Sequence, residues 1–172
     1  MFSMIEDETS ELCPRNYYQR IIKAYPEHEH LARYEPAVGF IIRQEPKIKA
    51  GRAILGTCFM PRVNGELSGL FDWMLEKTLG FFPDFLVMLD GHFWFNVSDR
   101  EREILMFHEM MHMAIAVDQY GALKFNRLTG DPVWALIGHD IEEFNAVVAR
   151  YGEWTPEIRS FLEAARESRN GA

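Results

Sequence analysis

The pentapeptide His108 to His112, His-Glu-Met-Met-His, constrains the fold of this chain more than any other feature. In an α-helix, residues four apart lie on one face, one turn above each other, so both imidazoles can converge on a single metal ion. Zinc accepts neutral histidine nitrogens and, in catalytic sites, keeps one position for water. Glu109 is then placed to take a proton from that water as a general base. The pattern predicts a zinc-dependent hydrolase, and in the first place a peptidase.

The residues before the pentapeptide predict that it lies on a helix. Ser98 to Glu101 has the Ser-x-x-Glu pattern of a capping box, which predicts a helix from Asp99 to about Val117. The i, i+3, i+4 rhythm then predicts one buried stripe that holds both histidines, with Glu109 towards its rim. The predicted members of this stripe are Ile104, His108, Met111, His112 and Ile115.

A catalytic zinc site takes three protein ligands, so a third must come from elsewhere in the chain. His139 is the only histidine after the pentapeptide and is our first choice. It comes just before a helix predicted from about residue 141 to residue 151. Asp140 is expected either to be the N-cap of that helix or to orient a ligating histidine through its carboxylate. Glu142 and Glu143 stay open as alternatives, because carboxylates also ligate zinc. Their other interpretation is favourable interaction with the helix dipole.

The remaining periodicities predict an α+β fold, with a small mixed or antiparallel sheet packed against the helix of the pentapeptide and further helices. The predicted strands are Val38 to Arg43, Ala53 to Met60, Asp84 to Asp90 and Phe93 to Val97, and the predicted helices include Asn16 to Tyr25, Leu70 to Leu79 and Thr155 to Arg169. The helix Leu70 to Leu79 is expected to bury one side, which includes Met74, and to end at a Gly80 cap. Trp134 is expected in a short turn or helix that begins at Asp131. Glu27 to His30 is expected to be a solvated turn. Residues 1–15 are expected to form an N-terminal arm, and residues 16–172 a single domain.

Composition and charge exclude several classes of function. The formal net charge of −8 disfavours a broad nucleic-acid interface, which needs clustered Lys and Arg. Two cysteines are too few for a disulfide framework, and the first residues lack the pattern of a signal peptide. No stretch approaches the roughly 20 apolar residues of a membrane span. We therefore expect a soluble, intracellular protein that binds neither nucleic acid nor membrane.

Two segments together resemble a known family. Residues 106–114, M-F-H-E-M-M-H-M-A, followed by residues 138–144, G-H-D-I-E-E-F, are similar to the motifs of the putative phage metallopeptidases. This resemblance implies a compact zincin-like domain, zinc held by His108, His112 and His139, and Glu109 as the catalytic base. It also implies a phage or prophage origin, action in the bacterial cytoplasm, and a peptide or protein substrate aligned on the strand Ala53 to Met60.

The sequence leaves several alternatives open. A donor for the oxyanion is expected, and His92, Tyr120 and Arg127 are the candidates. The metal could instead serve a non-catalytic structural or regulatory module of phage origin. A third hypothesis is an interaction protein that binds through aromatic residues, with the histidines packed in its core. The substrate, its cleavage specificity and the oligomeric state are not determined by the sequence.

Overall fold

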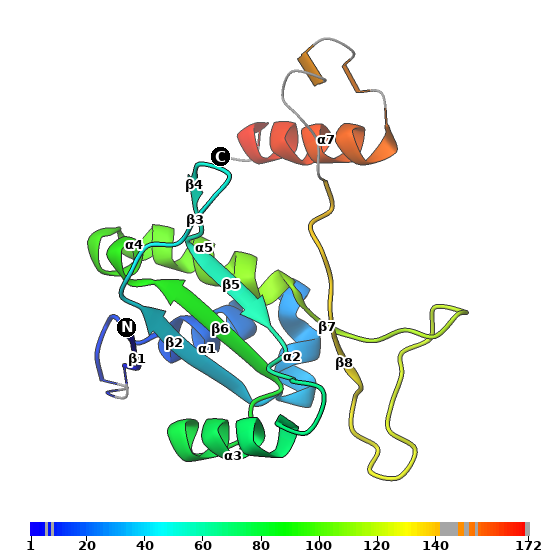
Figure 1. Cartoon of the computed structure of the whole chain (residues 1–172). Helices are drawn as coiled ribbons and strands as arrows, with labels where there is room; N and C mark the ends of the chain where they lie inside the picture. Colours follow the sequence, from blue (N-terminus) through cyan, green and yellow to red (C-terminus); the bar gives the residue numbers. More distant parts are fainter. Residues whose placement is uncertain (6, 8, 142–147, 150–151, 154, 171–172) are drawn as a thin grey trace. The chain divides into compact units, whose positions relative to one another are not determined.

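A four-stranded mixed sheet forms the centre of the N-terminal part of the chain in the computed structural model (Figure 1). Its strand order is β1-β2-β6-β5. β2 (Val38–Arg43) and β6 (Phe85–Asp90) are parallel, while β1 (Phe2–Ser3) and β5 (Gly56–Phe59) pair antiparallel at the two edges. β2 and β6 are runs of apolar residues buried on both faces, as is typical of parallel strands. The predicted α+β class with a small mixed sheet is therefore confirmed.

The structure describes residues 1–5, 7, 9–141, 148–149, 152–153 and 155–170. The backbone forms two compact units, Met1–Ile137 and Gly138–Ala172, which are described separately. In the second unit, α7 (Pro156–Asn170) confirms the predicted C-terminal helix, and its Ile158 N–H donates to Thr155 Oγ1 at 3.4 Å. Most of the predicted helix at residues 141–151, with Glu142 and Glu143, lies outside the described residues. The assignment of residues 16–172 to one domain stays a prediction.

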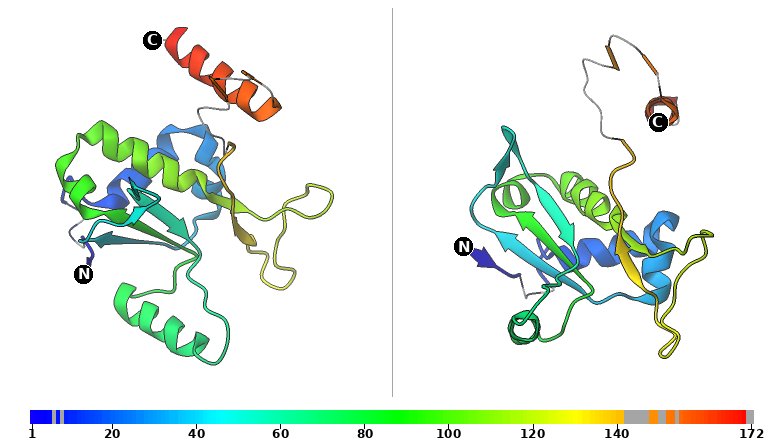
Figure 2. Two further views of the ribbon diagram at one scale, coloured as in Figure 1. Left: turned by 45° about the horizontal axis from the view of Figure 1, so that its top comes forward. Right: turned by 45° about the vertical axis from the view of Figure 1, so that its right-hand side comes forward.

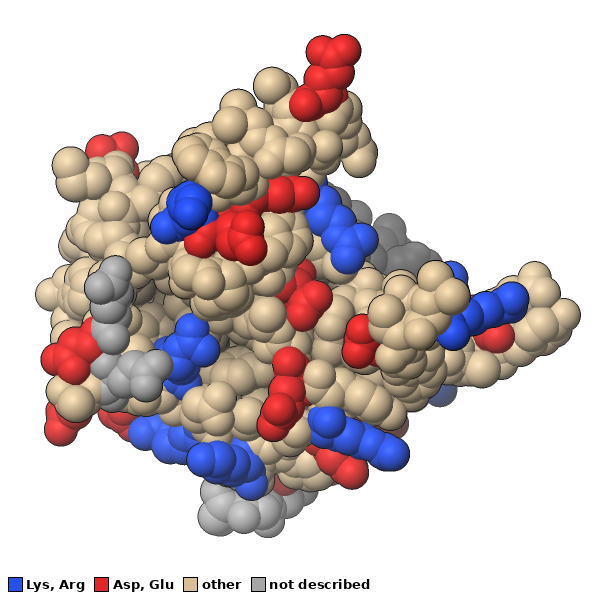
Figure 3. Space-filling model, turned by 90° about the horizontal axis from the view of Figure 1, so that it is seen from below, with Lys and Arg blue, Asp and Glu red and all other residues tan. Residues whose placement is uncertain are grey.

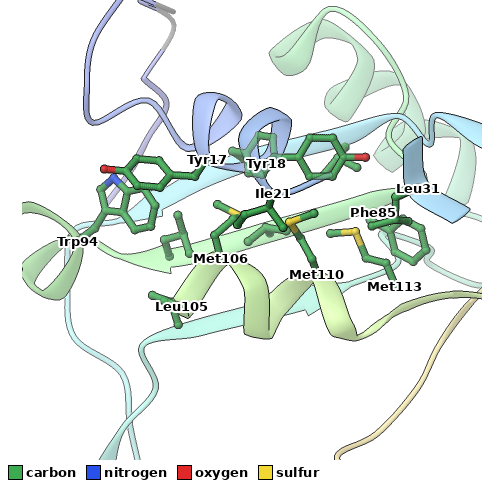
Figure 4. Close-up of a cluster of buried hydrophobic side chains, with 14 of the residues drawn as sticks. Tyr17, Tyr18, Ile21, Leu31, Phe85, Trp94, Leu105, Met106, Met110 and Met113 are labelled. Carbon is green, nitrogen blue, oxygen red and sulfur yellow. The ribbon is translucent and has the colours of Figure 1, made fainter. Parts of the chain in front are cut away.

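Two helices, α1 (Pro14–Ala24) and α5 (Asp99–Met111), pack side by side against the sheet, as the views of Figure 2 agree. Their buried side chains meet those of β6 in one apolar core (Figure 4). The core residues labelled there are Tyr17, Tyr18, Ile21, Leu31, Phe85, Trp94, Leu105, Met106, Met110 and Met113. Burial of this apolar surface is the main favourable contribution to folding, at about 25 cal/mol per Å². It also holds α5 in one rotational position about its axis.

Hydrogen bonds between α1 and the first turns of α5 add to this packing. The Tyr17 hydroxyl donates to Asp99 Oδ1 at 2.7 Å, and the Tyr25 hydroxyl donates to Glu103 Oε1 at 2.7 Å. Arg20 lies 3.0 Å from the Glu103 carboxylate. Since these partners are some 80 residues apart in sequence, they specify which turn of α5 faces α1.

The shorter elements connect this framework. They are η1 (Pro26–His28), α2 (Glu29–Tyr34), the hairpin of β3 (Ile48–Lys49) and β4 (Arg52–Ala53), α3 (Ser68–Leu79), α4 (Gly91–Asn96), and the paired strands β7 (Met113–Ile115) and β8 (Trp134–Leu136). Phe2 and Ser3, expected within an arm, form the edge strand β1.

Two of the predicted elements have the wrong type. Phe93 to Val97 was expected to be a strand, but it falls largely in helix α4, because the Asp90 carboxylate accepts a hydrogen bond from Phe93 N at 3.0 Å and caps the helix. Trp134, expected in a turn or helix, lies in strand β8. The first outcome has a local cause, the cap at Asp90, whereas the second depends on pairing with the distant strand β7.

Helix α3 is less buried than its apolar residues predicted. Leu70 to Leu79 was expected to present a buried side, yet no residue of α3 is fully buried, and Met74 is 53% exposed. The predicted end is confirmed, since Gly80 caps the helix with a φ of 80°.

Charges of both signs are interspersed among uncharged residues on the face shown in Figure 3. Such a mixture is ordinary for a surface in contact with water. Among the described helices, none has the length and apolar character that crossing a membrane requires. The expectation that the chain does not bind nucleic acid stays a prediction.

The solvated turn predicted at Glu27 to His30 is wrong, because His28 is buried. Residues 27–30 belong to η1 and α2, and the His28 side chain is fully buried, with its ring 4.6 Å from the ring of Phe107. Among the described residues, neither ring nitrogen has a hydrogen-bond partner. Burial, with a smaller contribution from His30, lowers the pKa of His28 from 6.5 to about 4. The imidazole is therefore neutral in the folded protein at neutral pH.

This burial predicts a loss of stability in mild acid. Between the folded pKa of about 4 and the unfolded value of 6.5, the unfolded chain binds more protons, so stability falls as the pH drops through that window. From pH 7 to pH 5, the free energy of unfolding of the wild type should fall by about 2 kcal/mol more than that of His28→Leu. Urea unfolding at both pH values measures this difference.

The exposed His92 provides the control, because His92→Leu should keep the pH dependence of the wild type. Equal pH dependence in the wild type and in His28→Leu would show that His28 is not the titrating group.

Candidate metal centre

The predicted start of the site helix is confirmed and its predicted end is wrong. Ser98 Oγ accepts from Glu101 N at 3.3 Å, while Glu101 Oε2 accepts from Ser98 N at 2.9 Å, which completes the capping box. Helix α5 was expected to reach Val117, but it ends at Met111 with His112 as its C-cap. The next three residues form β7 instead, because they pair with β8, which lies some 20 residues further along the chain.

The side chains of the motif on α5 are not buried and exposed in the way that the sequence predicted. The buried residues of α5 are Leu105, Met106, Glu109 and Met110, while His108 is exposed and His112 is half-buried. The expected inward stripe through Ile104 and the two histidines is therefore wrong, and Ile104 is 58% exposed. Glu109, expected at the rim, is only 3% exposed. Packing on α1 and the sheet selects the stripe next to the predicted one.

The two histidines of α5 have a geometry that suits one metal ion. Their ring centroids are 5.3 Å apart and their planes are inclined at 81°. Two imidazoles that bind one tetrahedral ion through nitrogens at about 2.1 Å would place their centroids roughly 5 Å apart. The side chains thus have the required spacing without rearrangement of the helix.

A hydrogen bond to Ile137, the residue after β8, orients the second histidine. His112 Nδ1 lies 2.8 Å from the carbonyl oxygen of Ile137. A carbonyl oxygen only accepts, so Nδ1 carries the proton and the other ring nitrogen, Nε2, keeps its lone pair. This tautomer is the one that ligates a metal through Nε2, and a partner on the opposite nitrogen is the usual companion of a ligating histidine.

The hydrogen bonding between His112 and Ile137 also limits how far the backbone of His139 can lie from His112. Ile137 N donates to the carbonyl oxygen of His112 at 3.0 Å, so the backbone of Ile137 bonds His112 twice. His139 follows two residues later, and the covalent chain keeps its Cα within about 7 Å of that of Ile137. Among the described residues, His108, His112 and His139 are a set of side chains that could hold a metal ion.

Glu109 is buried against strand β5. Burial raises the pKa of Glu109 to about 6, while the neighbouring His112 and a hydrogen bond from the Cys58 backbone N–H act to lower it. Burial also raises the pKa of the Cys58 thiol to about 12, with help from the Glu109 charge. Cys58 is therefore a neutral thiol beside the carboxylate. Glu109 has the pKa of a group that both takes and returns protons near neutral pH.

Gly56 leaves the room that Glu109 occupies. A Cβ atom added at Gly56 would lie 2.7 Å from Cδ and 2.9 Å from Cγ of Glu109. A glycine inside a strand is the sequence signal of such a close approach, and Gly56 is a site residue that its strand pattern alone did not identify. The approaching group is here a carboxylate side chain.

A cavity of about 400 Å³ adjoins these residues, and His108, Glu109 and Gly56 are in its lining. The three candidates for an oxyanion donor, His92, Tyr120 and Arg127, are not among the described residues that line it. Tyr120 is 85% exposed. Their proposed role has no support from this geometry.

Comparison with known proteins identifies one family. A model of the family described as putative phage metallopeptidase matches residues 8–166. No curated protein matches the chain. No solved structure matches it either.

The contact between Gly56 and Glu109 predicts a specific loss of stability. Gly56→Ala should lower the free energy of unfolding by about 1–3 kcal/mol, because the new methyl group overlaps the buried Glu109 side chain. Urea unfolding measures the change. Gly69 in α3 has no atom within 4 Å of the corresponding position, so Gly69→Ala should be neutral or slightly stabilising. Equal stability of the two variants would contradict the close contact.

Proposed function

The chain belongs to the putative phage metallopeptidase family, and we propose that it is a zinc-dependent peptidase. In this proposal His108, His112 and His139 hold the zinc and Glu109 is the general base. The observation that carries it is the pair of α5 imidazoles, 5.3 Å apart, directly beside a buried glutamate. Three neutral nitrogen donors are a ligand set that zinc prefers in catalytic sites.

Zinc bound by these residues would supply a water molecule of lowered pKa and would polarise a carbonyl oxygen. Glu109 would accept a proton from that water and would donate it to the nitrogen of the amide bond that breaks. The Cys58 N–H and the packing against Gly56 hold the Glu109 carboxylate in position for both transfers.

The substrate of this proposal is a peptide or protein. β5 is an edge strand of the sheet and pairs on one side with β6. An extended peptide can pair with the outer edge of such a strand through main-chain hydrogen bonds, which contribute affinity with little sequence preference. The family name associates the chain with phages, so we place its action in the cytoplasm of a bacterial host cell.

Two rival functions are weaker on the same geometry. An interaction protein with the histidines packed in its core does not fit, because His108 is exposed and His112 is half-buried. A purely structural metal site has no use for a buried glutamate of raised pKa, which burial alone makes unfavourable. The substitution of Glu109 described below distinguishes a structural metal site from a peptidase.

The third ligand is tested by metal content. Protein purified without metal and resupplied with zinc should bind one zinc per chain, and His139→Ala should weaken zinc binding by more than about 100-fold, since even an outer-shell partner contributes 10–100-fold. Zinc analysis after dialysis, with competition against a chelator, measures this. His92→Ala, which alters an exposed histidine outside the set, is the control. Full zinc retention by His139→Ala would move the role to Glu142 or Glu143.

The catalytic role of Glu109 is tested by a near-isosteric change. Glu109→Gln should lower hydrolysis of a mixed peptide library by at least about 100-fold, because the amide cannot accept the proton of the water. It should bind zinc as the wild type does. Mass spectrometry of the library and zinc analysis provide the two measurements. Hydrolysis that survives in Glu109→Gln would refute the mechanism, and zinc binding by an inactive wild type would favour the structural module.

A further inference from the structure

The cavity beside Glu109 is built mainly from apolar side chains. Its walls are Ile54 and Leu55, from the segment between β4 and β5, together with Phe93, Ile104 and Leu105 from α4 and α5. His108 and Glu109 belong to the same lining, so the cavity is continuous with the candidate metal centre. Its volume of about 400 Å³ lies within the range of small-ligand pockets.

The one other charged residue of this lining is already engaged. Glu101 Oε2 accepts hydrogen bonds from Ser98 N at 2.9 Å and from Ser98 Oγ at 2.7 Å, as part of the capping box of α5. Its carboxylate is committed to the start of the helix. Apart from the two residues of the metal centre, the cavity therefore offers a ligand little except apolar contact.

A buried ion pair holds one wall of the cavity in place. The Arg43 guanidinium donates to the carbonyl oxygen of Ile54 at 2.7 Å and lies 3.2 Å from the Asp90 carboxylate. Asp90 also caps α4, the helix that carries Phe93. Two walls thus depend on one network, so the cavity is formed before any ligand enters and loses little entropy on binding.

Ile104 forms an open wall of the cavity. It is 58% exposed, although it is a large aliphatic residue on a helix whose neighbouring stripe is fully buried. An apolar side chain that enters the cavity would cover it and remove its apolar surface from water, which favours binding.

We propose that this cavity binds a large apolar side chain, of the leucine, methionine or phenylalanine type, from the substrate residue next to the cleaved bond. The inference rests on the proposed peptidase function, since it takes the substrate to be a peptide. It adds a preference to that function: backbone pairing with β5 is indifferent to sequence, and the cavity selects one side chain.

The test uses a matched pair of variants. Ile104→Lys puts a charge in the open wall, and the fold is retained because this position is 58% exposed. Leu70→Lys makes the same kind of change at a residue of α3 that is 51% exposed and does not line the cavity. Ile104→Ala removes apolar contact without adding charge.

The first measurement is cleavage of a mixed peptide library by the zinc-loaded enzyme, with mass spectrometry of the new termini. The wild type and Leu70→Lys should favour leucine, methionine or phenylalanine over alanine at one position next to the cleaved bond by at least about tenfold. Ile104→Ala should weaken the preference and Ile104→Lys should abolish it. Cleavage without an apolar preference, or with the same preference in Ile104→Lys, would overturn the proposal.

The second measurement does not depend on catalysis. In the wild type, N-acetyl-leucinamide should shift the backbone amide NMR signals of residues 53–56 and 104–105, and N-acetyl-alaninamide should shift them far less. These shifts should persist in Leu70→Lys and disappear in Ile104→Lys. Shifts without any hydrolysis would support the cavity and reject the peptidase, whereas hydrolysis without the shifts would reject the cavity alone.

Discussion

The packing of α5 on α1 and the sheet is the interaction on which the site depends. Leu105, Met106 and Met110 are buried in the core, and this sets the rotation of the helix about its axis. Glu109 lies on the same buried stripe, and its carboxylate is directed to β5, while His108 is exposed. One hydrophobic contact surface thus gives neighbouring residues of a five-residue motif different environments, with Glu109 buried, His112 half-buried and His108 exposed.

The residue at which α5 ends is as important for the candidate site as the face of α5 that is buried. His112 is the last residue before the chain changes from helix to strand, and its backbone and ring both form hydrogen bonds with Ile137, the residue after β8. The helix termination, the tautomer of His112 and the path of the chain towards His139 therefore share one cause, the pairing of β7 with β8. A longer helix would have separated these features.

Buried polar groups recur around the core, and each has a distinct environment. Arg43 and Asp90 are paired with each other and with backbone groups, as buried charges generally must be. Glu109 is buried beside the Cys58 backbone N–H, and burial raises its pKa. His28 lies against Phe107 and stays neutral. Pairing and pKa thus distinguish the structural ion pair of Arg43 and Asp90 from the Glu109 carboxyl group, whose pKa is close to neutral pH.

The sequence by itself determined the elements whose signals are local: the capping box at Ser98, the glycine cap at Gly80, the buried strands β2 and β6, and the helical spacing of the two histidines. These depend on residues within a few positions of one another. The tertiary structure alone decided which stripe of α5 is buried, where the helix ends, and that Gly56 faces Glu109. Each of these features depends on a partner that is distant in the chain or on which of two neighbouring helix faces is buried. The spacing of apolar residues fits two faces one residue apart almost equally well, so it does not select between them. The motif was therefore visible in the sequence, whereas the direction in which each of its side chains points was not.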